Sequence, residues 1–418
     1  MRKRRIAIIG AGAAGCFCAV NIKKRMPEAE VTVYESGRKP LTKVAITGGG
    51  RCNLTNSFEH VRSVKEAYPR SEKLMKRALK VFSNNDVMEW FEREGVALTV
   101  QADGCVFPLS QDAMEIVCTL TRLMNSYGVR LLCDRRISQI TPLSDGGYDI
   151  DGAQYEKVVV TTGGAPTLSR LSFLDAFQLE KMESVPSLFT FNIDNKALHS
   201  LMGTVVENVT ARLTGTKLSA SGPLLITHWG LSGPAILKLS SYGARVLKER
   251  EYRMEVAINW FGEERETEVA ERLHILVSEN SKKQLSSVYP EELVQRLWIF
   301  LLERAGLSPQ KRWQELGAKQ LNRLAALLTN DTYAISGKGA YKEEFVTCGG
   351  IALSNINPST MECKAYPGLF FAGEVLDVDA ITGGYNLQAA WTMGYISACS
   401  VTIADATEEG TTAAEEEP

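Results

Sequence analysis

The sequence holds no Cys-x-x-Cys pair, only four histidines, and no apolar run of the roughly eighteen residues that a membrane span needs. Its nine cysteines are an odd number, which fits free thiols in a reducing cytoplasm better than a disulfide framework. With 47 basic and 49 acidic residues the net charge is −2, so no strong field favours nucleic acid or an anionic membrane. No Ser–His–Asp order or metal-ligand spacing is present. We therefore predict a cytoplasmic protein with no metal, no nucleic-acid partner and no membrane partner.

The amino terminus has the composition of a secretion signal but not its pattern. Residues 1–5 are mostly basic and residues 6–20 are mostly apolar, as in a signal peptide. Three glycines interrupt the apolar run, and a polar, basic stretch follows it without a clear cleavage site. We therefore predict that this segment belongs to the fold.

The first 35 residues predict a complete β-α-β unit. Residues 5–9 and 30–35 have the short apolar character of strands, and residues 13–26 have that of a helix. The turn between the first strand and the helix is rich in glycine. This order is typical of a dinucleotide-binding fold.

The glycines of that turn form a G-x-G-x-x-G motif at Gly10, Gly12 and Gly15. The first glycine permits a tight turn, the second lets a pyrophosphate approach the backbone, and the third lets helix and strand pack closely. The start of the helix offers free N–H groups to the phosphates. Glu35 ends the second strand, where a carboxylate accepts hydrogen bonds from a ribose. This unit alone leaves NAD and FAD both open.

Three further glycine-rich segments favour FAD. The loop at residues 43–56 follows the second strand where an NAD domain would have an ordinary crossover helix. Residues 161–166 turn tightly after an apolar strand. The third segment, residues 368–377, forms a strand followed by Gly-Glu. It leads to residues 382–388, which open the last long helix. The start of that helix, aimed at the flavin pyrimidine, would stabilise the negative charge of the reduced ring.

The length of the chain and the changes in residue pattern along it predict more than one domain. A chain of 418 residues is too long for one compact core. Short alternating segments over residues 188–259 predict β structure, and charged helical patterns fill residues 262–328. Residues 407–418 are acidic and low in complexity, so we predict a disordered tail.

Three long motifs resemble those of the bacterial HI0933-like flavoproteins, a family that includes bile-acid dehydro-reductases and aminoacetone oxidase. They are Gly-Gly-Gly-Arg-Cys-Asn-Leu-Thr-Asn at 48–56, Thr-His-Trp-Gly-Leu-Ser-Gly-Pro-Ala at 227–235, and Ala-Gly-Glu-Val-Leu-Asp-Val-Asp at 372–379 continuing to Gly-Gly-Tyr-Asn-Leu-Gln at 383–388. The resemblance covers residues 4–404. It leaves the substrate open, because characterised members act on unrelated compounds.

The resemblance implies an α/β fold in which a Rossmann-like FAD-binding domain, made of two segments, is interrupted by a β-rich domain and a small helical subdomain. The expected boundaries are 1–187 and 345–405 for the FAD-binding domain, 188–261 for the β-rich domain, 262–344 for the helical subdomain and 406–418 for the acidic tail.

Carried over position by position, the resemblance also implies a set of contacts to a non-covalent FAD. These residues are Gly10, Gly12, Ala14, Gly15, Glu35, Lys43, Gly49, Arg51, Asn53, Gly163, Gly373, Asp377, Gly384, Asn386 and Leu387. Ala380 stands where many relatives have glycine, which puts only the local turn in question.

The flavin carries the redox chemistry, so the protein needs few catalytic side chains. His228 precedes a glycine-rich turn and is the candidate general acid; the alternative is a histidine that fixes the turn. Cys52 has no second cysteine within a few residues, so packing or cofactor contact is favoured over a redox role. Arg51 fits the pyrophosphate better than a substrate carboxylate.

These observations predict an FAD-dependent oxidoreductase acting on a small organic substrate. NAD(P)H or oxygen would be the second redox partner, and NAD(P)H would bind transiently because no second G-x-G-x-x-G is present. The alternative is an FAD-binding, RNA-directed protein, because tRNA-modifying flavoproteins share this fold. Such a protein needs an extended basic surface, whereas the overall balance here is acidic and the clustered basic residues occupy one predicted helix: Lys73, Lys76, Arg77 and Lys80.

Overall fold

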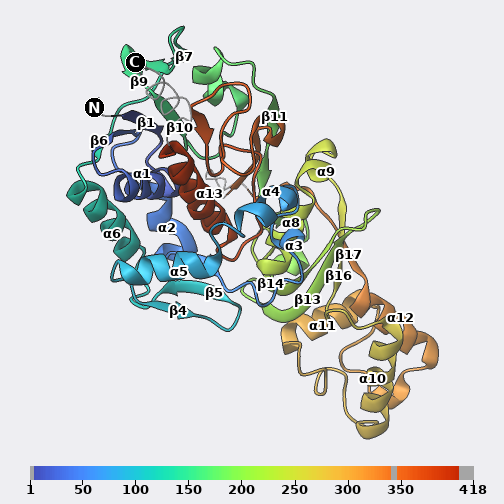
Figure 1. Cartoon of the computed structure of the whole chain (residues 1–418). Coiled ribbons are helices and arrows are strands. Elements are labelled where there is room, and N and C mark those ends of the chain that lie inside the picture. The colour runs from blue at the N-terminus through green and yellow to red at the C-terminus, as the bar shows by residue number, and fades with distance from the viewer. Residues whose placement is uncertain (1–3, 340–345, 404–418) are drawn as a thin grey trace, which may run out of the picture. The chain divides into compact units, whose positions relative to one another are not determined.

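The computed structural model describes residues 4–339 and 346–403, so the predicted disordered tail at 406–418 lies outside the described residues. The chain divides into two compact units. The first unit is drawn from Met1–Ser184 and Thr347–Pro418, and the second from Val185–Val346. Each unit is described on its own below (Figure 1).

The first unit contains the predicted β-α-β start and the last long helix. Its helices are α1 (Ala13–Arg25), α2 (Thr42–Gly50), α3 (Val64–Ala67), α4 (Glu72–Ala78), α5 (Asn84–Arg93), α6 (Ala113–Ser126), η1 (Leu168–Leu174), η3 (Leu353–Asn355) and α13 (Tyr385–Val401). Its strands are β1 (Arg5–Ile9), β2 (Glu30–Tyr34), β3 (Thr55–Asn56), β4 (Leu98–Val100), β5 (Cys105–Pro108), β6 (Arg130–Leu132), β7 (Ile140–Pro142), β8 (Tyr148–Ile150), β9 (Ala153–Tyr155), β10 (Lys157–Val160), β11 (Lys181–Ser187), β19 (Val346–Ile351) and β20 (Leu369–Phe371).

A five-stranded parallel sheet is the centre of the first unit. Its strand order is β20-β10-β1-β2-β6, so strands from the start, middle and end of the chain lie side by side. The central strands are apolar and buried along almost their whole length, as expected for a parallel sheet covered on both faces. The carboxyl ends of β1, β10 and β20 therefore meet at one edge.

Helix α1 is the most enclosed helix of the sheet layer. It packs against α13 and α6, and Figure 1 shows α1 and α13 beside the sheet. Gly394 of α13 permits the first of these contacts, because a Cβ there would lie 2.7 Å from the carbonyl oxygen of Ala14. Ten of the thirteen α1 residues are buried, which explains why its sequence lacks a charged face until its last turn.

The second unit is built on a seven-stranded antiparallel sheet of order β17-β16-β13-β14-β15-β12-β18. The strands are β12 (Phe191–Asn192), β13 (Val205–Leu213), β14 (Ser219–Ile226), β15 (Gly230–Ser232), β16 (Glu255–Asn259), β17 (Asp331–Ala334) and β18 (Gly337–Lys338). The helices are α7 (Lys196–His199), α8 (Pro234–Tyr242), α9 (Ala244–Glu249), α10 (Glu266–Glu279), α11 (Gln295–Arg304), η2 (Trp313–Glu315) and α12 (Ala318–Thr329).

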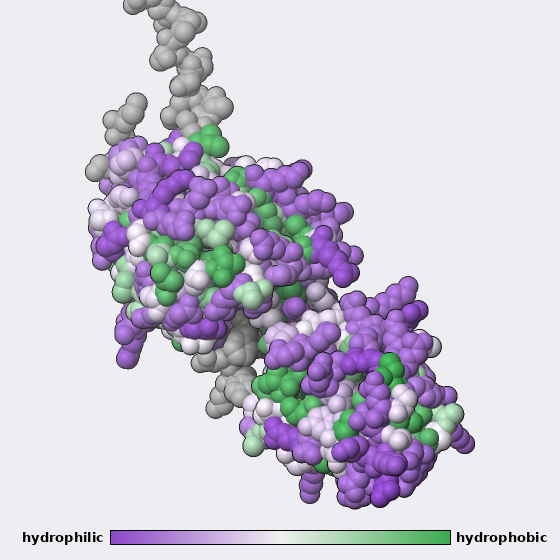
Figure 2. All heavy atoms as spheres, turned by 90° about the horizontal axis from the view of Figure 1, so that it is seen from below, coloured by the Kyte–Doolittle hydropathy of each residue, from purple (hydrophilic) through white to green (hydrophobic). Residues whose placement is uncertain are grey.

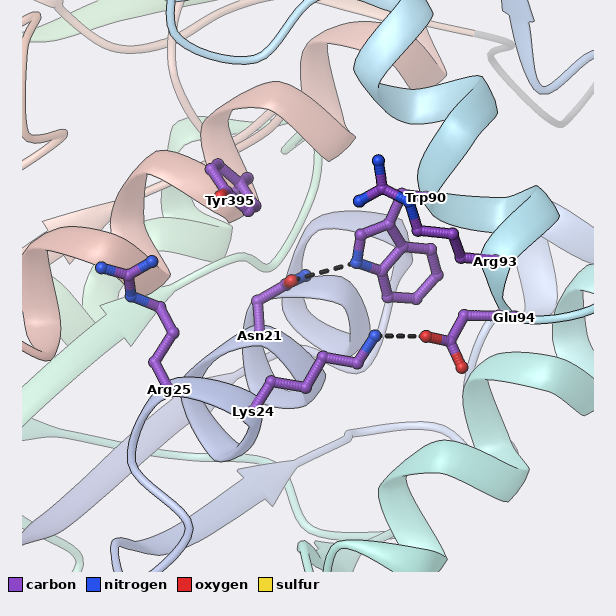
Figure 3. Close-up of a pocket in the computed structure, with 7 residues that line it drawn as sticks. All are labelled: Asn21, Lys24, Arg25, Trp90, Arg93, Glu94 and Tyr395. Atoms are coloured by element: carbon purple, nitrogen blue, oxygen red, sulfur yellow. Dashed lines mark hydrogen bonds and ion pairs between the residues drawn. The ribbon is translucent and has the colours of Figure 1, made fainter.

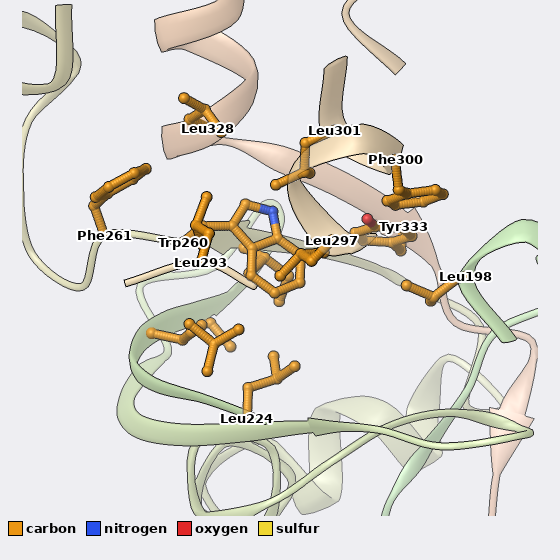
Figure 4. Close-up of a cluster of buried hydrophobic side chains, with 14 of the residues drawn as sticks. Leu198, Leu224, Trp260, Phe261, Leu293, Leu297, Phe300, Leu301, Leu328 and Tyr333 are labelled. Atoms are coloured by element: carbon orange, nitrogen blue, oxygen red, sulfur yellow. The ribbon is translucent and has the colours of Figure 1, made fainter. Parts of the chain in front are cut away.

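One apolar cluster joins this sheet to the helices that follow it. Trp260, after β16, is fully buried among side chains from α11, α12 and the sheet (Figure 4). The β-rich and helical stretches of the sequence therefore share one core. The indole N–H of Trp260 donates to Asp331, which also accepts hydrogen bonds from Tyr333 and Arg304.

The predicted fold class is confirmed, with a parallel Rossmann-type sheet in one unit and antiparallel and helical structure in the other. One local prediction was wrong. Residues 42–46 are helical, whereas the whole glycine-rich segment that contains them was predicted to be a loop. The regular helix ends at Thr47, and Gly48 and Gly49 adopt φ of +58° and +70°. The glycines therefore end the helix instead of preventing it.

Within the described residues, every helix is too short or too polar to cross a bilayer. Figure 2 shows that hydrophilic residues cover most of the face of each unit seen in that view, with smaller hydrophobic areas between them.

We expect Asp331→Ala to destabilise the second unit by about 3–5 kcal/mol, because it leaves the charge of Arg304 and two buried donors without their acceptor. Urea unfolding followed by far-ultraviolet circular dichroism measures the change. Glu249→Ala, which removes an exposed acid of the same unit, is the control and should shift stability by less than about 0.5 kcal/mol. Equal effects of the two substitutions would contradict a structural role for Asp331.

Candidate functional site

The turn between β1 and α1 is closed by two glycines that admit no side chain. Gly10 has φ of +108°, and a Cβ there would lie 2.5 Å from the carbonyl oxygen of Thr161. A Cβ on Gly15 would collide with the carbonyl oxygen of Gly10. The hydroxyl of Thr161 donates to that same oxygen at 2.8 Å. These contacts fix where the first turn of α1 begins.

Gly12 differs from its neighbours because its missing side chain leaves open space. Its φ is −84°, and nothing lies within 4 Å of the position that a Cβ would take. Gly12 is the N-cap of α1, no side chain caps the helix, and the first turn holds no acidic residue. The N–H groups and the positive end of the helix dipole therefore face a space that fits a pyrophosphate.

Glu35 follows β2 and lies against this turn. Its Oε2 accepts a hydrogen bond from the amide of Ala11 at 2.8 Å, and its Oε1 accepts one from Gly37 at 2.7 Å. The Ser36 hydroxyl also donates to Oε1, at 3.4 Å. The carboxylate is thus oriented by its neighbours, and Oε2 retains a lone pair for a further donor. A ribose hydroxyl is such a donor.

Lys43, Gly163 and Gly373 come together although they are far apart in the sequence. A Cβ on Gly163 would lie 3.6 Å from Nζ of Lys43, and one on Gly373 would lie 3.2 Å from Cβ of Ala14. Lys43 pairs with Glu374 at 2.7 Å, and the other oxygen of Glu374 accepts from the amide of Thr347 at 2.8 Å. The three glycine-rich segments therefore converge at the edge where β1, β10 and β20 end.

The non-helical end of α2 has an open glycine position and, at its C-cap, a positioned cation. Gly49 has no atom within 4 Å of a Cβ position. The guanidinium of Arg51 lies 4.4 Å from the centre of the Phe107 ring, and its Nε donates to the carbonyl of Gly48 at 3.2 Å. Arg51 is exposed, so its charge remains accessible to an anion.

Asn53 and Gly384 shape the start of α13. Gly384 has φ of +89°, and a Cβ there would collide with the carbonyl oxygen of Thr55. With its amide oriented so that Nδ2 donates to Thr55 at 3.0 Å, Asn53 accepts from the amide of Gly384 at 3.2 Å. Substituting Gly384 would therefore disturb the fold as well as any cofactor contact.

The remaining expected cofactor residues surround the same turn. The side chain of Asn386 accepts from the amide of Ala380 at 2.9 Å and donates to its carbonyl at 3.0 Å, which stabilises the turn where the sequence has alanine. The amide of Asp377 donates to Ile351 at 2.9 Å, and its side chain is half-buried. Leu387 packs against the core of the first unit.

A buried ion pair at this loop has no obvious sequence signal. Arg70 Nε donates to Oδ1 of Asp379 at 2.7 Å, and a second guanidinium nitrogen contacts Oδ2. The side chain of Asp379 is fully buried. The one sequence feature that points to this pair is the run of acids at 377 and 379, which places a second carboxylate in an apolar motif. A carboxylate that is buried there requires a charged or hydrogen-bonding partner.

The surroundings of His228 and Cys52 bear on the roles that the sequence suggested for them. His228 lies in the second unit, exposed between β14 and β15, with its ring 4.2 Å from that of Trp229. The turn itself is fixed by Thr227, whose hydroxyl lies 3.1–3.2 Å from the carbonyl and amide of Gly230.

Burial raises the pKa of Cys52 to about 12, so the thiol is protonated at neutral pH, as expected for a cysteine that packs in the core.

A separate hollow of about 240 Å³ lies on the first unit, among α1, α5 and α13 (Figure 3). Its polar groups bond one another: Trp90 donates to Asn21 at 3.1 Å, and Lys24 pairs with Glu94 while lying 4.4 Å from the Trp90 ring. None of the expected FAD contacts lines it. We therefore assign no substrate to it.

The parallel sheet, the uncapped start of α1 and the converging glycines define a Rossmann-type dinucleotide-binding fold. The HI0933-like protein Rossmann domain matches residues 4–400, so the chain belongs to the HI0933-like family and is an FAD-dependent oxidoreductase.

Three relatives match nearly the whole chain. The ribosomal RNA dihydrouridine synthase of Escherichia coli (strain K12) is 30% identical over 404 residues, which cover 94% of this chain and 96% of the relative. The protein of the same description from Haemophilus influenzae is 29% identical over 413 residues, covering 94% and 97%. A 3-dehydro-bile acid delta(4,6)-reductase of Clostridium scindens is 26% identical over 409 residues, covering 94% and 98%.

We expect Gly12→Val to yield a folded but colourless protein, because the side chain fills only the open space in front of α1. FAD binding should weaken by at least about 3 kcal/mol, which is more than 100-fold. Fluorescence titration with FAD and circular dichroism test the two halves of this expectation. Gly15→Val is the matched comparison and should unfold the first unit, because its side chain meets the backbone of Gly10. A yellow Gly12→Val protein would contradict the assignment.

Proposed function

We propose that this enzyme reduces a carbon–carbon double bond conjugated to a carbonyl group, and that its substrate is a uridine in ribosomal RNA. The observation that carries the proposal is the similarity to two ribosomal RNA dihydrouridine synthases across more than nine-tenths of both chains. The matched region extends over both units, so the similarity is not limited to the cofactor-binding unit.

The chemistry of the relatives' names supports the reaction class. Dihydrouridine differs from uridine by two hydrogens added across C5–C6, a double bond conjugated to the C4 carbonyl. The delta(4,6) double bonds of a 3-oxo steroid are likewise conjugated to a carbonyl. In both cases a hydride adds to an electron-poor carbon and a proton adds at the neighbouring carbon.

Bound FAD would supply the hydride chemistry, and the chain would hold it in place. The uncapped start of α1 would bind the pyrophosphate, with Gly12 leaving the necessary space. Glu35 would accept from the adenosine ribose. Because the proposed reaction is a reduction, the electron donor would be a nicotinamide cofactor, NADH or NADPH, which visits the flavin without a Rossmann domain of its own.

The overall charge is a weaker argument against RNA than it first appears. Six of the 49 acidic residues lie in residues 404–418, which contain no Lys or Arg. The other 403 residues therefore carry 47 basic side chains against 43 acidic ones. The excess of acids belongs to the carboxyl-terminal end, and the rest of the chain is slightly basic, which is compatible with a polyanionic substrate.

A small enone is the second candidate substrate. The steroid reductase of Clostridium scindens matches the chain over a similar length at 26% identity. Binding a small enone would require no basic surface, whereas binding RNA would, so the two candidate substrates can be separated experimentally.

We expect the flavin-loaded protein to form dihydrouridine in unmodified transcripts of bacterial 16S and 23S ribosomal RNA when NADH or NADPH is added without oxygen. Nucleoside mass spectrometry detects the product as a gain of two hydrogens on uridine. Gly12→Val protein serves as the control lacking flavin. Reduction of a 3-oxo-delta(4,6) steroid with no change in the RNA would overturn the RNA assignment and support the small enone.

A further inference from the structure

One face of α4 and of the turn that follows it carries four positive side chains in solvent. Lys73, Lys76 and Arg77 lie on α4 at helical spacing, Lys80 lies in the turn two residues after its end, and all four are exposed. The described residues offer none of them an ion pair within 4.0 Å. The three cations on α4 span about 6 Å along the helix axis from Lys73 to Arg77, at roughly 1.5 Å per residue. We call these four residues the α4 cationic face.

The opposite face of α4 holds the helix on the first unit. Leu74, Met75 and Ala78 are buried, and α4 contacts α13, beside which it lies in Figure 1. The apolar residues account for the folding of α4, whereas nothing in the fold requires four cations on its outer side.

The chain just before α4 is bonded to the loop that opens α13. Ala67 accepts from the amide of Ile381 at 3.0 Å, and the hydroxyl of Tyr68 donates to the carbonyl of Tyr385 at 2.8 Å. Arg70 forms an ion pair with the buried Asp379 in the same loop. Three residues just before α4 are therefore bonded to the loop that contains Gly383 and Gly384.

We propose that the α4 cationic face is the surface that binds the phosphate backbone of the RNA substrate. Cations without internal partners contribute most when they neutralise phosphates and release counterions. Such contacts position a nucleic acid without reading its sequence. Because the segment before α4 is bonded to the loop that opens α13, RNA held on this face lies beside a segment that is tied to that loop. This inference rests on the proposed function, since it assumes an RNA substrate.

The experiment compares flavin-loaded wild-type protein with a variant carrying Lys73→Gln, Lys76→Gln, Arg77→Gln and Lys80→Gln. Fluorescence anisotropy measures binding to 16S and 23S ribosomal RNA transcripts at several KCl concentrations. The slope of log affinity against log salt should fall by about 3 in magnitude, at roughly 0.7 per phosphate contact on single strands. Affinity near 0.1 M KCl should fall at least about tenfold, with flavin content and reduction by the nicotinamide donor unchanged.

The control variant removes four exposed cations of the same unit outside α4: Arg130, Arg135, Arg136 and Arg170, each to Gln. It should retain the wild-type slope. Wild-type slope in the α4 variant, or an equal loss in both variants, would overturn the assignment of this surface while leaving RNA as the substrate. A wild-type protein that neither binds nor modifies RNA would overturn both the surface and the proposed function.

Discussion

The contact between Gly15 and the carbonyl of Gly10 constrains the first unit more than any other feature of the cofactor edge. It brings α1 so close to the end of β1 that Gly15 tolerates no side chain, and a side chain on Gly10 would collide with the backbone of Thr161. Thr161, from the end of the neighbouring strand β10, bonds the same carbonyl, and Gly394 lets α13 press on the backbone of Ala14 from another side. Helix α1 is therefore fixed in position and direction by backbone contacts, which adjust less easily than side chains.

That fixed direction determines the electrostatics of the site. The first turn of α1 has neither a capping side chain nor an acid, so its N–H groups need an external acceptor. Around this turn the protein places Glu35, held by two backbone amides, and the Lys43–Glu374 pair. The arrangement suits a ligand that is anionic at its centre and has hydroxyl groups at its side. A dinucleotide such as FAD has this chemistry.

The sequence predicts what depends on neighbouring residues and misses what depends on distant ones. The β1–α1–β2 unit and Glu35 follow from local periodicity and glycine spacing. The pairing of Arg70 with Asp379 joins positions 309 apart, so no local pattern reveals it. The helix over residues 42–46 was missed because the glycines after it dominate the segment. The expectation of no nucleic-acid partner rested on the net charge of −2 of the whole chain, and six of the 49 acids behind that charge lie in residues 404–418.

A crystal structure of the flavin-loaded protein tests the central claim most directly. The account predicts electron density for the FAD pyrophosphate within hydrogen-bond distance of the backbone amides at the start of α1, beside Gly12, with the adenosine ribose on the carboxylate of Glu35. Flavin density at another place on the first unit, with the start of α1 filled only by solvent, would contradict it.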